Sequence, residues 1–451
     1  MSHPSEQQTA PPDGEGTALR RAISGKLLFL FILGDVLGAG VYALVGEIAG
    51  EVGGAVWLPM LVALLLAMLT AASFAELVTK YPRAGGSAVF AQRAFRSPLV
   101  SFLVGYCMLA AGVTSAAGLS LAFGGDYLSV FVEVPAVVAA VVFLTLVALL
   151  NARGITESVR SNVVMTVVEV SGLILVIVLV AVFVGQGNGN PAQISEFPAG
   201  VNPASAVLAA SLLAYYSFVG FEVSANVAEE VRDPARVYPK ALFGALATAG
   251  VVYLLIGLAS AAALPAEELA GSSSPLLDVV TATGFGVPPW LFSAVALIAV
   301  ANGALLTMIM ASRLAFGMAE QGLLPAALGR VLPNRRTPWV AIVVTTVIAM
   351  ALTVTGDLAA LAETVVLLLL FVFLSTNIAV LVLRRDSVDH DHFRVFTPIP
   401  YLAVASCLLL LSQQAPGVWL RAGVLLVIGV VLHAAGRIVS RRDTANGQVP
   451  Q

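Results

Sequence analysis

Long apolar segments alternate with short polar connections along most of this chain. Each apolar segment has roughly the 20 residues that an α-helix needs to cross the hydrocarbon core of a bilayer. Twelve such segments are predicted, at residues 27–49, 54–78, 99–123, 134–152, 160–184, 204–228, 240–264, 289–312, 338–356, 361–383, 398–414 and 418–439. The pattern therefore predicts an all-α polytopic membrane protein with twelve transmembrane helices.

Basic residues lie almost entirely on one side of the predicted helices. Of the 23 Lys and Arg residues, all but Arg421 fall on the side of the amino terminus. Cytosolic loops of membrane proteins are enriched in Lys and Arg, so both termini of this multi-pass cell-membrane protein are predicted to be cytosolic. Residues 1–25 are interpreted as a disordered cytosolic tail and residues 441–451 as a second cytosolic tail.

The composition supports a membrane protein and excludes several functions. Hydrophobic residues make up 59% and charged residues 11%, with a mean hydropathy of +0.95, whereas about a quarter of a soluble protein is charged. The net charge of -3 gives no support for nucleic-acid binding. The two cysteines, Cys107 and Cys407, lie in apolar segments, so neither a disulfide nor a metal site is expected. No catalytic cluster or phosphate-binding loop is visible, which disfavours an enzyme or an ATP-driven pump and leaves secondary transport without a cofactor.

Two predicted helices contain glycine next to an acid near the middle of the membrane. The first helix contains Gly34, Asp35, Gly38 and Gly40, and the sixth contains Gly220 and Glu222. Glycine weakens a helix by about 1 kcal/mol relative to alanine, and an acid at this depth costs about 2.5 to 3.5 kcal/mol. Close helix packing is one explanation. The other is an inverted-repeat transporter, in which paired interruptions form the binding site.

Under the second explanation, helices 1 and 6 are broken and each begins a five-helix repeat. The predicted repeats cover residues 26–184 and 204–384, and helices 11 and 12 follow at 395–440. Freed amides at residues 38–41 would face an anion, and freed carbonyls near Val36 and Phe218 would face an ammonium group. An α-amino acid carries both groups and is the predicted class of substrate.

Several stretches of the chain resemble the amino acid-polyamine-organocation (APC) transporter superfamily. The segment Gly38–Tyr42 is similar to the GxG[IV][FY] pattern of its first helix, and Tyr216–Glu222 is similar to the pattern of its sixth helix. Further similar stretches are Glu76, Pro82–Ser87, Ala228–Pro234, Pro239, Asn302–Arg313 and Gly322–Pro325. The similarity covers predicted helices one to eight in order, and the remaining helices by topology.

This resemblance implies a five-plus-five inverted-repeat fold (LeuT-like) and amino acid transport by alternating access. The residues expected at the substrate site are Val36, Gly38, Ala39, Gly40, Val41, Tyr216, Phe218, Gly220 and Phe221. By this analogy the amides of residues 38–41 hold the substrate carboxylate, and the carbonyls of Val36, Phe218 and Phe221 receive the amino group. The side chains of Tyr216 and Phe218 are interpreted either as walls or gates of the site or as ordinary aromatic packing.

Three acids, Asp35, Glu169 and Glu222, lie deep enough to couple transport to an ion. Each has a structural alternative: Asp35 as a helix-packing acid, Glu169 as a hydrogen-bonding partner of another helix, and Glu222 as a cap on freed amides. The expected coupling ion is H⁺. Sodium is the alternative, with hydroxyl ligands from Thr307 and Ser312, although such hydroxyls usually bond to their own helix.

The predicted function is amino acid transport by proton-coupled symport or by exchange. A polyamine or cationic amino acid transporter or antiporter is the alternative, because the buried acids could pair with a second amine. The expected partners are a small amino acid substrate and the lipid bilayer. No sequence signal specifies an oligomeric state.

Overall fold

A computed structural model describes residues 23–445, apart from residue 39 and the segments 83–85, 154–157 and 333–336. In this part of the chain the helices of the first half are α1 (Gly25–Val36), α2 (Gly40–Val52), α3 (Trp57–Lys80), α4 (Gly86–Phe95), α5 (Pro98–Phe123), α6 (Asp126–Ser129), α7 (Ala136–Arg153), α8 (Ser158–Gly185) and η1 (Pro191–Ser195). Those of the second half are α9 (Pro203–Tyr216), η2 (Phe221–Glu230), α10 (Pro234–Ala263), α11 (Ala266–Ala270), α12 (Pro275–Ala282), α13 (Pro289–Glu320), η3 (Ala326–Gly329), α14 (Trp339–Thr355), α15 (Leu358–Leu383), α16 (Pro398–Ser412) and α17 (Pro416–Ala445). The elements labelled η are 3₁₀-helices, and no β-strand is found among the described residues.

The helices confirm the predicted all-α polytopic fold. Among the described residues, nine helical segments are long and apolar enough to cross a membrane, and the bent pair α1–α2 raises the number to ten. The two shorter apolar helices, α14 and α16, have 17 and 15 residues and coincide with the predicted ninth and eleventh spans. Every predicted segment thus contains helix, while twelve full crossings and the division into two repeats stay predictions.

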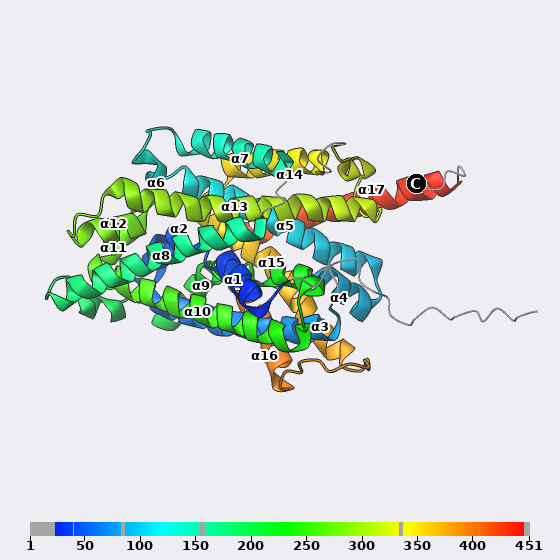
Figure 1. The fold of residues 1–451 in the computed structure, drawn as a ribbon, viewed down its shortest axis with the longest axis horizontal. Helices are drawn as coiled ribbons and strands as arrows, with labels where there is room; N and C mark the ends of the chain where they lie inside the picture. The colour runs from blue at the N-terminus through cyan, green and yellow to red at the C-terminus, as the bar shows by residue number, and fades with distance from the viewer. Residues whose placement is uncertain (1–22, 39, 83–85, 154–157, 333–336, 446–451) are drawn as a thin grey trace, which may run out of the picture.

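The long helices lie side by side along the long axis of the molecule (Figure 1). Helices α11 and α12 lie at one end, and the end of α17 lies at the other. Small residues allow the central helices to approach closely, which is how helices gain packing energy in lipid. At Gly112 of α5, for example, an added Cβ would lie 3.4 Å from the Cβ of Ala311 in α13.

Both predicted interruptions are present. Helix α1 ends at Val36 and α2 begins at Gly40, with an angle of 42° between their axes. Helix α9 ends at Tyr216, and η2 begins at Phe221 after Gly220, whose φ of 126° is strained for any residue with a side chain. The predicted site residue Ala39 lies outside the described residues.

Candidate functional site

The two interruptions contact each other through glycines. An added Cβ on Gly40 would lie 2.9 Å from Cα of Ser217, and one on Gly220 would lie 2.8 Å from the carbonyl oxygen of Asp35. These neighbours are backbone atoms, which cannot move aside as the end of a side chain can. The absence of a side chain at both positions therefore allows the unwound segments to meet.

Tyr253 of α10 bridges the two interruptions. Its hydroxyl lies 2.5 Å from the carbonyl oxygen of Val36 and 3.0 Å from that of Ser217. A hydroxyl has a single proton to donate, so it can satisfy only one of these carbonyls at a time. The Tyr253 ring also packs edge-on against Phe218, with the centroids 5.2 Å apart. The predicted ammonium acceptor, the Val36 carbonyl, thus already has a donor in the protein.

Sequence reasoning missed Tyr253. The available signal was a tyrosine in the interior of an apolar helix, because a buried phenol usually finds a hydrogen-bond partner. The identity of that partner was not readable, since Val36 lies 217 residues away along the chain.

The predicted carboxylate site lies at the first turn of α2. Gly40 and Val41 are buried and Gly38 is partly buried. The first amides of an α-helix have no acceptor within the helix, so those of Gly40 and Val41 are available to an anion at the interruption. Binding of a substrate carboxylate there stays a prediction.

The acids near the interruptions have different surroundings. Glu222 is buried, and its Oε2 accepts a hydrogen bond of 2.9 Å from the Gly220 amide, as expected for a cap on a freed amide. In contrast, Oδ2 of Asp35 and both carboxyl oxygens of Glu169 are buried with no hydrogen-bond partner among the described residues. Burying an ionised carboxylate without partners is costly, so Asp35 and Glu169 are better suited to hold a proton or meet a cation than Glu222.

Glu169 belongs to a face of α8 that packs on the first broken helix. An added Cβ at Gly34 would collide with Thr166, and one at Gly172 would lie 2.7 Å from the Tyr42 hydroxyl. The Tyr42 hydroxyl donates to the backbone carbonyl of Glu169 at 2.9 Å. Gly220 contacts the Asp35 backbone and donates its amide to Glu222, and Thr166 on the Glu169 face of α8 contacts Gly34 beside Asp35, so the fold brings the three predicted acids into one region.

The predicted aromatic residues are packed inside the protein. The Tyr216 hydroxyl is 2.9 Å from Oγ of Ser115 in α5, which ties α9 to α5. Phe221 stacks on Phe373 at 5.4 Å and meets Phe74 edge-on at 5.6 Å. The Phe221 ring is thus packed among other aromatic rings, and the Tyr216 hydroxyl is paired with Ser115.

The hydroxyls considered as sodium ligands bond to their own helix. Thr307 donates to the carbonyl of Gly303 at 2.7 Å, and Ser312 donates to that of Ile309 at 3.0 Å. Asn151 also donates to Ser312. Hydrogen bonding within their own helix, the alternative to sodium ligation, therefore accounts for both hydroxyls.

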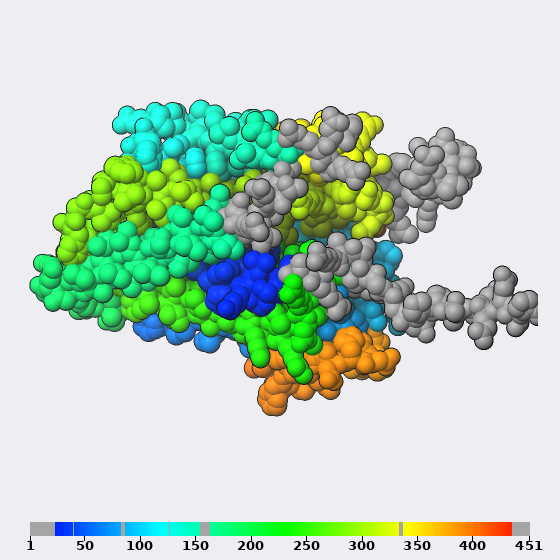
Figure 2. Space-filling model, in the orientation of Figure 1, coloured from blue at the N-terminus to red at the C-terminus, as the bar shows by residue number. Residues whose placement is uncertain are grey.

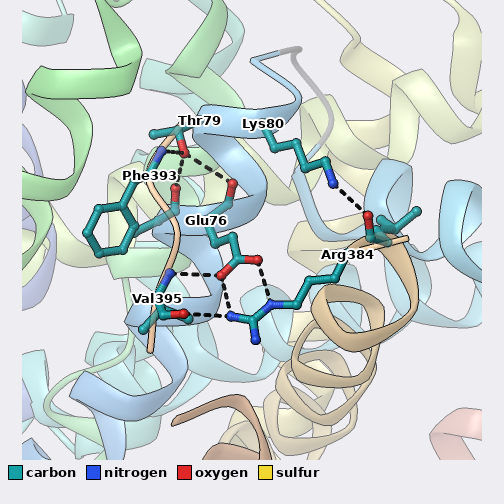
Figure 3. Close-up of polar contacts among 8 residues, drawn as sticks. Glu76, Thr79, Lys80, Arg384, Phe393 and Val395 are labelled. Carbon is teal, nitrogen blue, oxygen red and sulfur yellow. Dashed lines mark hydrogen bonds and ion pairs between the residues drawn. The ribbon is translucent and has the colours of Figure 1, made fainter. Parts of the chain in front are cut away.

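A buried ion pair joins α3 to the segment after α15 (Figure 3). Nε and Nη2 of Arg384 lie 2.9 and 2.7 Å from the two carboxyl oxygens of Glu76, which also accepts from the Val395 amide at 2.9 Å. The Glu76 and Arg384 side chains are only 3% and 11% exposed. Hydrogen bonding to Glu76 raises the pKa of Arg384, and Glu76 is a structural residue in this arrangement.

Further bonds hold the same connection. Lys80 donates to the carbonyls of Leu383 and Asp386, both at 2.6 Å, and so caps the end of α15. The Asp386 carboxylate accepts from Tyr81 at 3.0 Å and from Arg93 at 3.3 Å. These two hydrogen bonds lower the pKa of Asp386, and Tyr81 has its pKa raised to about 12 by burial and by this bond.

Two interrupted helices that meet inside a multi-pass helical protein are the architecture of many membrane transporters. Residues 23–433 match the family described as amino acid permease, and the chain belongs to that family.

The names of three similar proteins indicate three different substrates. The chain is 25% identical to a branched-chain amino acid permease of Bacillus subtilis, over 92% of this chain and 93% of the relative. It is 25% identical to a methylthioribose transporter of the same organism, over 94% of this chain and 95% of the relative. It is 27% identical to a low-affinity putrescine importer of Escherichia coli, over 73% of this chain and 75% of the relative.

Proposed function

We propose that this protein is a secondary active transporter that moves amino acids across the cytoplasmic membrane by alternating access. The observation that carries the proposal is the contact between the two interrupted helices, at Gly40 with Ser217 and at Gly220 with Asp35. At this point the carbonyls of Val36 and Ser217 lie within hydrogen-bond distance of the Tyr253 hydroxyl, and the first turn of α2 contacts Ser217 at Gly40. Such a site offers donors to a carboxylate and acceptors to an ammonium group.

A proton is the proposed coupling ion. Asp35 and Glu169 are suited to neutralisation by protonation, because their buried oxygens have no hydrogen-bond partner among the described residues. Sodium coupling is the weaker proposal, since the hydroxyls of Thr307 and Ser312 bond within their own helix. Exchange of one substrate for another is the alternative mode to symport.

A polyamine or cationic amino acid is the second candidate substrate. The three acids near the interruptions, Asp35 and Glu222 beside them and Glu169 on the neighbouring α8, form no ion pair with a basic side chain in the described part of the chain. A second amine on the substrate would supply the missing positive charge. The similarity to a protein named as a putrescine importer supports this candidate.

Thermal stabilisation and uptake test the proposal together. The purified protein is heated with neutral amino acids, cationic amino acids and putrescine, because a ligand that binds the folded state raises the melting temperature. Uptake of the stabilising compound is then measured in liposomes under a pH gradient or a sodium gradient. Stabilisation and pH-driven uptake of an amino acid are expected. Stabilisation by putrescine alone would favour the second candidate, and uptake driven only by sodium would exclude proton coupling.

A further inference from the structure

A groove with a basic rim lies between the beginnings of α1 and α10. Its volume is about 510 Å³. In Figure 2 the dark blue surface of α1 lies beside the green surface of the η2–α10 region on the same face. The residues of the groove that carry the argument are Lys26, Phe29, Leu30, Arg236, Val237 and Lys240.

The backbone brings the two walls together. The Ile23 amide donates to the Glu230 carbonyl, and the Arg232 amide donates to the Ile23 carbonyl, both at 3.0 Å. One turn further on, an added Cβ at Gly25 would lie 3.3 Å from Val237, so the two helices touch below the rim. The groove is therefore a fixed feature of the fold, held by backbone hydrogen bonds and close packing.

Three cations line this groove, and its lining includes no acid. Arg236 and Lys240 are four residues apart and share one face of α10, and Lys26 faces them from α1. All three side chains are exposed, and none forms an ion pair or hydrogen bond with another described residue. Within the described part of the chain, no acidic side chain therefore pairs with their positive charge.

The apolar part of the lining distinguishes this groove from a site for a free anion. Phe29, Leu30 and Val237 line the same groove, on helices that are apolar enough to enter the membrane. A ligand that fits both parts has a negative head and an apolar tail. Basic pockets between transmembrane helices bind anionic lipid head groups for this reason. A second groove of about 510 Å³, between α3, α10 and the start of α16, has Arg394 as its one lining cation and lacks this pattern.

We propose that the groove between α1 and α10 binds one anionic phospholipid. Lys26, Arg236 and Lys240 contact its phosphate, with the Arg236 guanidinium suited to bind two phosphate oxygens at once. An acyl chain lies along Phe29 and Leu30. The lipid connects α1, the first half of a broken helix, to α10, which carries Tyr253 at the candidate site.

The test uses the full chain, purified and delipidated in neutral detergent. Phosphatidylglycerol or phosphatidylcholine is added at equal mole fraction, and bound lipid is counted by native mass spectrometry while the melting temperature is followed. Phosphatidylglycerol is expected to bind and to raise the melting temperature, and raised ionic strength is expected to weaken the effect. Equal binding of both lipids, or an equal shift with inorganic phosphate alone, would overturn the proposal.

A matched pair of variants locates the site. The triple variant Lys26→Gln, Arg236→Gln, Lys240→Gln is expected to weaken phosphatidylglycerol binding about fivefold for each charge, and on the order of a hundredfold in total. The control variant removes three other exposed cations that have no side-chain partner among the described residues, namely Arg313, Arg330 and Arg385. It is expected to keep wild-type binding, and a loss as large as that of the groove variant would mean that diffuse surface charge attracts the lipid. If the triple variant does not fold, the single variant Arg236→Gln is used instead. We expect it to bind phosphatidylglycerol about fivefold more weakly. Unchanged binding would contradict the site.

Discussion

The hydroxyl of Tyr253 lies 2.5 Å from the carbonyl oxygen of Val36, at the end of the first half of a broken helix. The same hydroxyl lies 3.0 Å from the carbonyl of Ser217, at the other interruption. One side chain on α10 thus lies within hydrogen-bond distance of both unwound segments, at the carbonyls proposed to accept from a substrate ammonium group. Substrate binding and the Tyr253 contact are therefore expected to be coupled.

Replacing Tyr253 by Phe removes the hydroxyl and keeps the ring that packs on Phe218. Without substrate, we expect a loss of about 1 to 3 kcal/mol in the free energy of unfolding, because buried carbonyls lose their donor. With substrate, the amino group supplies the missing donor, so the ligand-induced rise in melting temperature should be larger than in the wild type. The measurement is a thermal shift with and without substrate.

Tyr238→Phe is the control for that variant. Tyr238 is also buried on α10, but its hydroxyl meets Oγ of Ser224 at 2.7 Å and contacts neither Val36 nor Ser217. It should lower stability without enlarging the substrate-induced shift. Identical shifts in the two variants would rule out a special role for the Tyr253 hydroxyl.

Gly40→Ala is expected to disrupt the contact between the interruptions. Its Cβ would lie 2.9 Å from Cα of Ser217, and overpacking of this kind typically costs about 1 to 3 kcal/mol. Gly50→Ala in the same helix is the matched control, since its Cβ would meet the Cβ of Ala270 at an ordinary 3.5 Å. Substrate binding should fall in the first variant and persist in the second. Unchanged binding in Gly40→Ala would contradict a site at this contact.

Glu169 and Glu222 are expected to behave differently when their charge is removed. Glu169→Gln replaces an acid that lacks hydrogen-bond partners among the described residues. It should leave the protein folded and make uptake insensitive to the pH gradient. Glu222→Gln weakens the cap on the Gly220 amide, so it should lower the melting temperature and keep the pH response. Uptake by both variants, measured in liposomes, distinguishes them, and a pH response that survives in Glu169→Gln would exclude Glu169 as the coupling acid.

The Glu76–Arg384 pair is expected to stabilise the connection between α15 and α16. Glu76→Gln leaves the Arg384 charge buried without its partner, which typically costs about 3 to 5 kcal/mol. Adding Arg384→Met should restore part of the loss, because the unpaired charge is then also removed. Melting temperatures of the two single variants and the double variant measure this coupling. Strictly additive losses would mean that the pair contributes nothing as a pair, and Arg385→Gln controls for loss of a neighbouring exposed charge.

We expect Asp386, which lies outside the membrane-spanning helices, to make a pH-dependent contribution to the stability of the folded protein. Hydrogen bonds from Tyr81 and Arg93 lower its pKa, so the stabilisation is complete above the unfolded value of about 3.9 and is lost as the pH falls through the folded value. Asp386→Asn should therefore melt slightly below the wild type at neutral pH, and the difference should vanish in strong acid. A difference that persists at all pH values would show that the charge of Asp386 is not responsible.

Local pattern was sufficient to predict the helical segments and the two interruptions. A stretch of about 20 apolar residues forms a helix in lipid whatever its neighbours are, because only internal hydrogen bonds can satisfy its backbone there. The glycines beside Asp35 and Glu222 likewise mark weak helical segments by their own chemistry. The structure confirms the breaks, at Val36 to Gly40 and at Tyr216 to Phe221.

Only the tertiary structure decided which distant groups meet. Arg384 pairs with Glu76 across 308 residues, and Tyr253 reaches Val36 across 217. Hydropathy placed Glu76 inside the predicted helix at residues 54–78, but it could not supply a partner. The sequence likewise left two roles open for each of Asp35, Glu169 and Glu222, and the fold gives Glu222 the Gly220 amide to cap but leaves the Glu169 carboxylate without a hydrogen-bond partner among the described residues. Hydropathy and glycine content act within one helix, whereas partners and burial depend on how helices pack, and that is set by contacts between residues far apart in the chain.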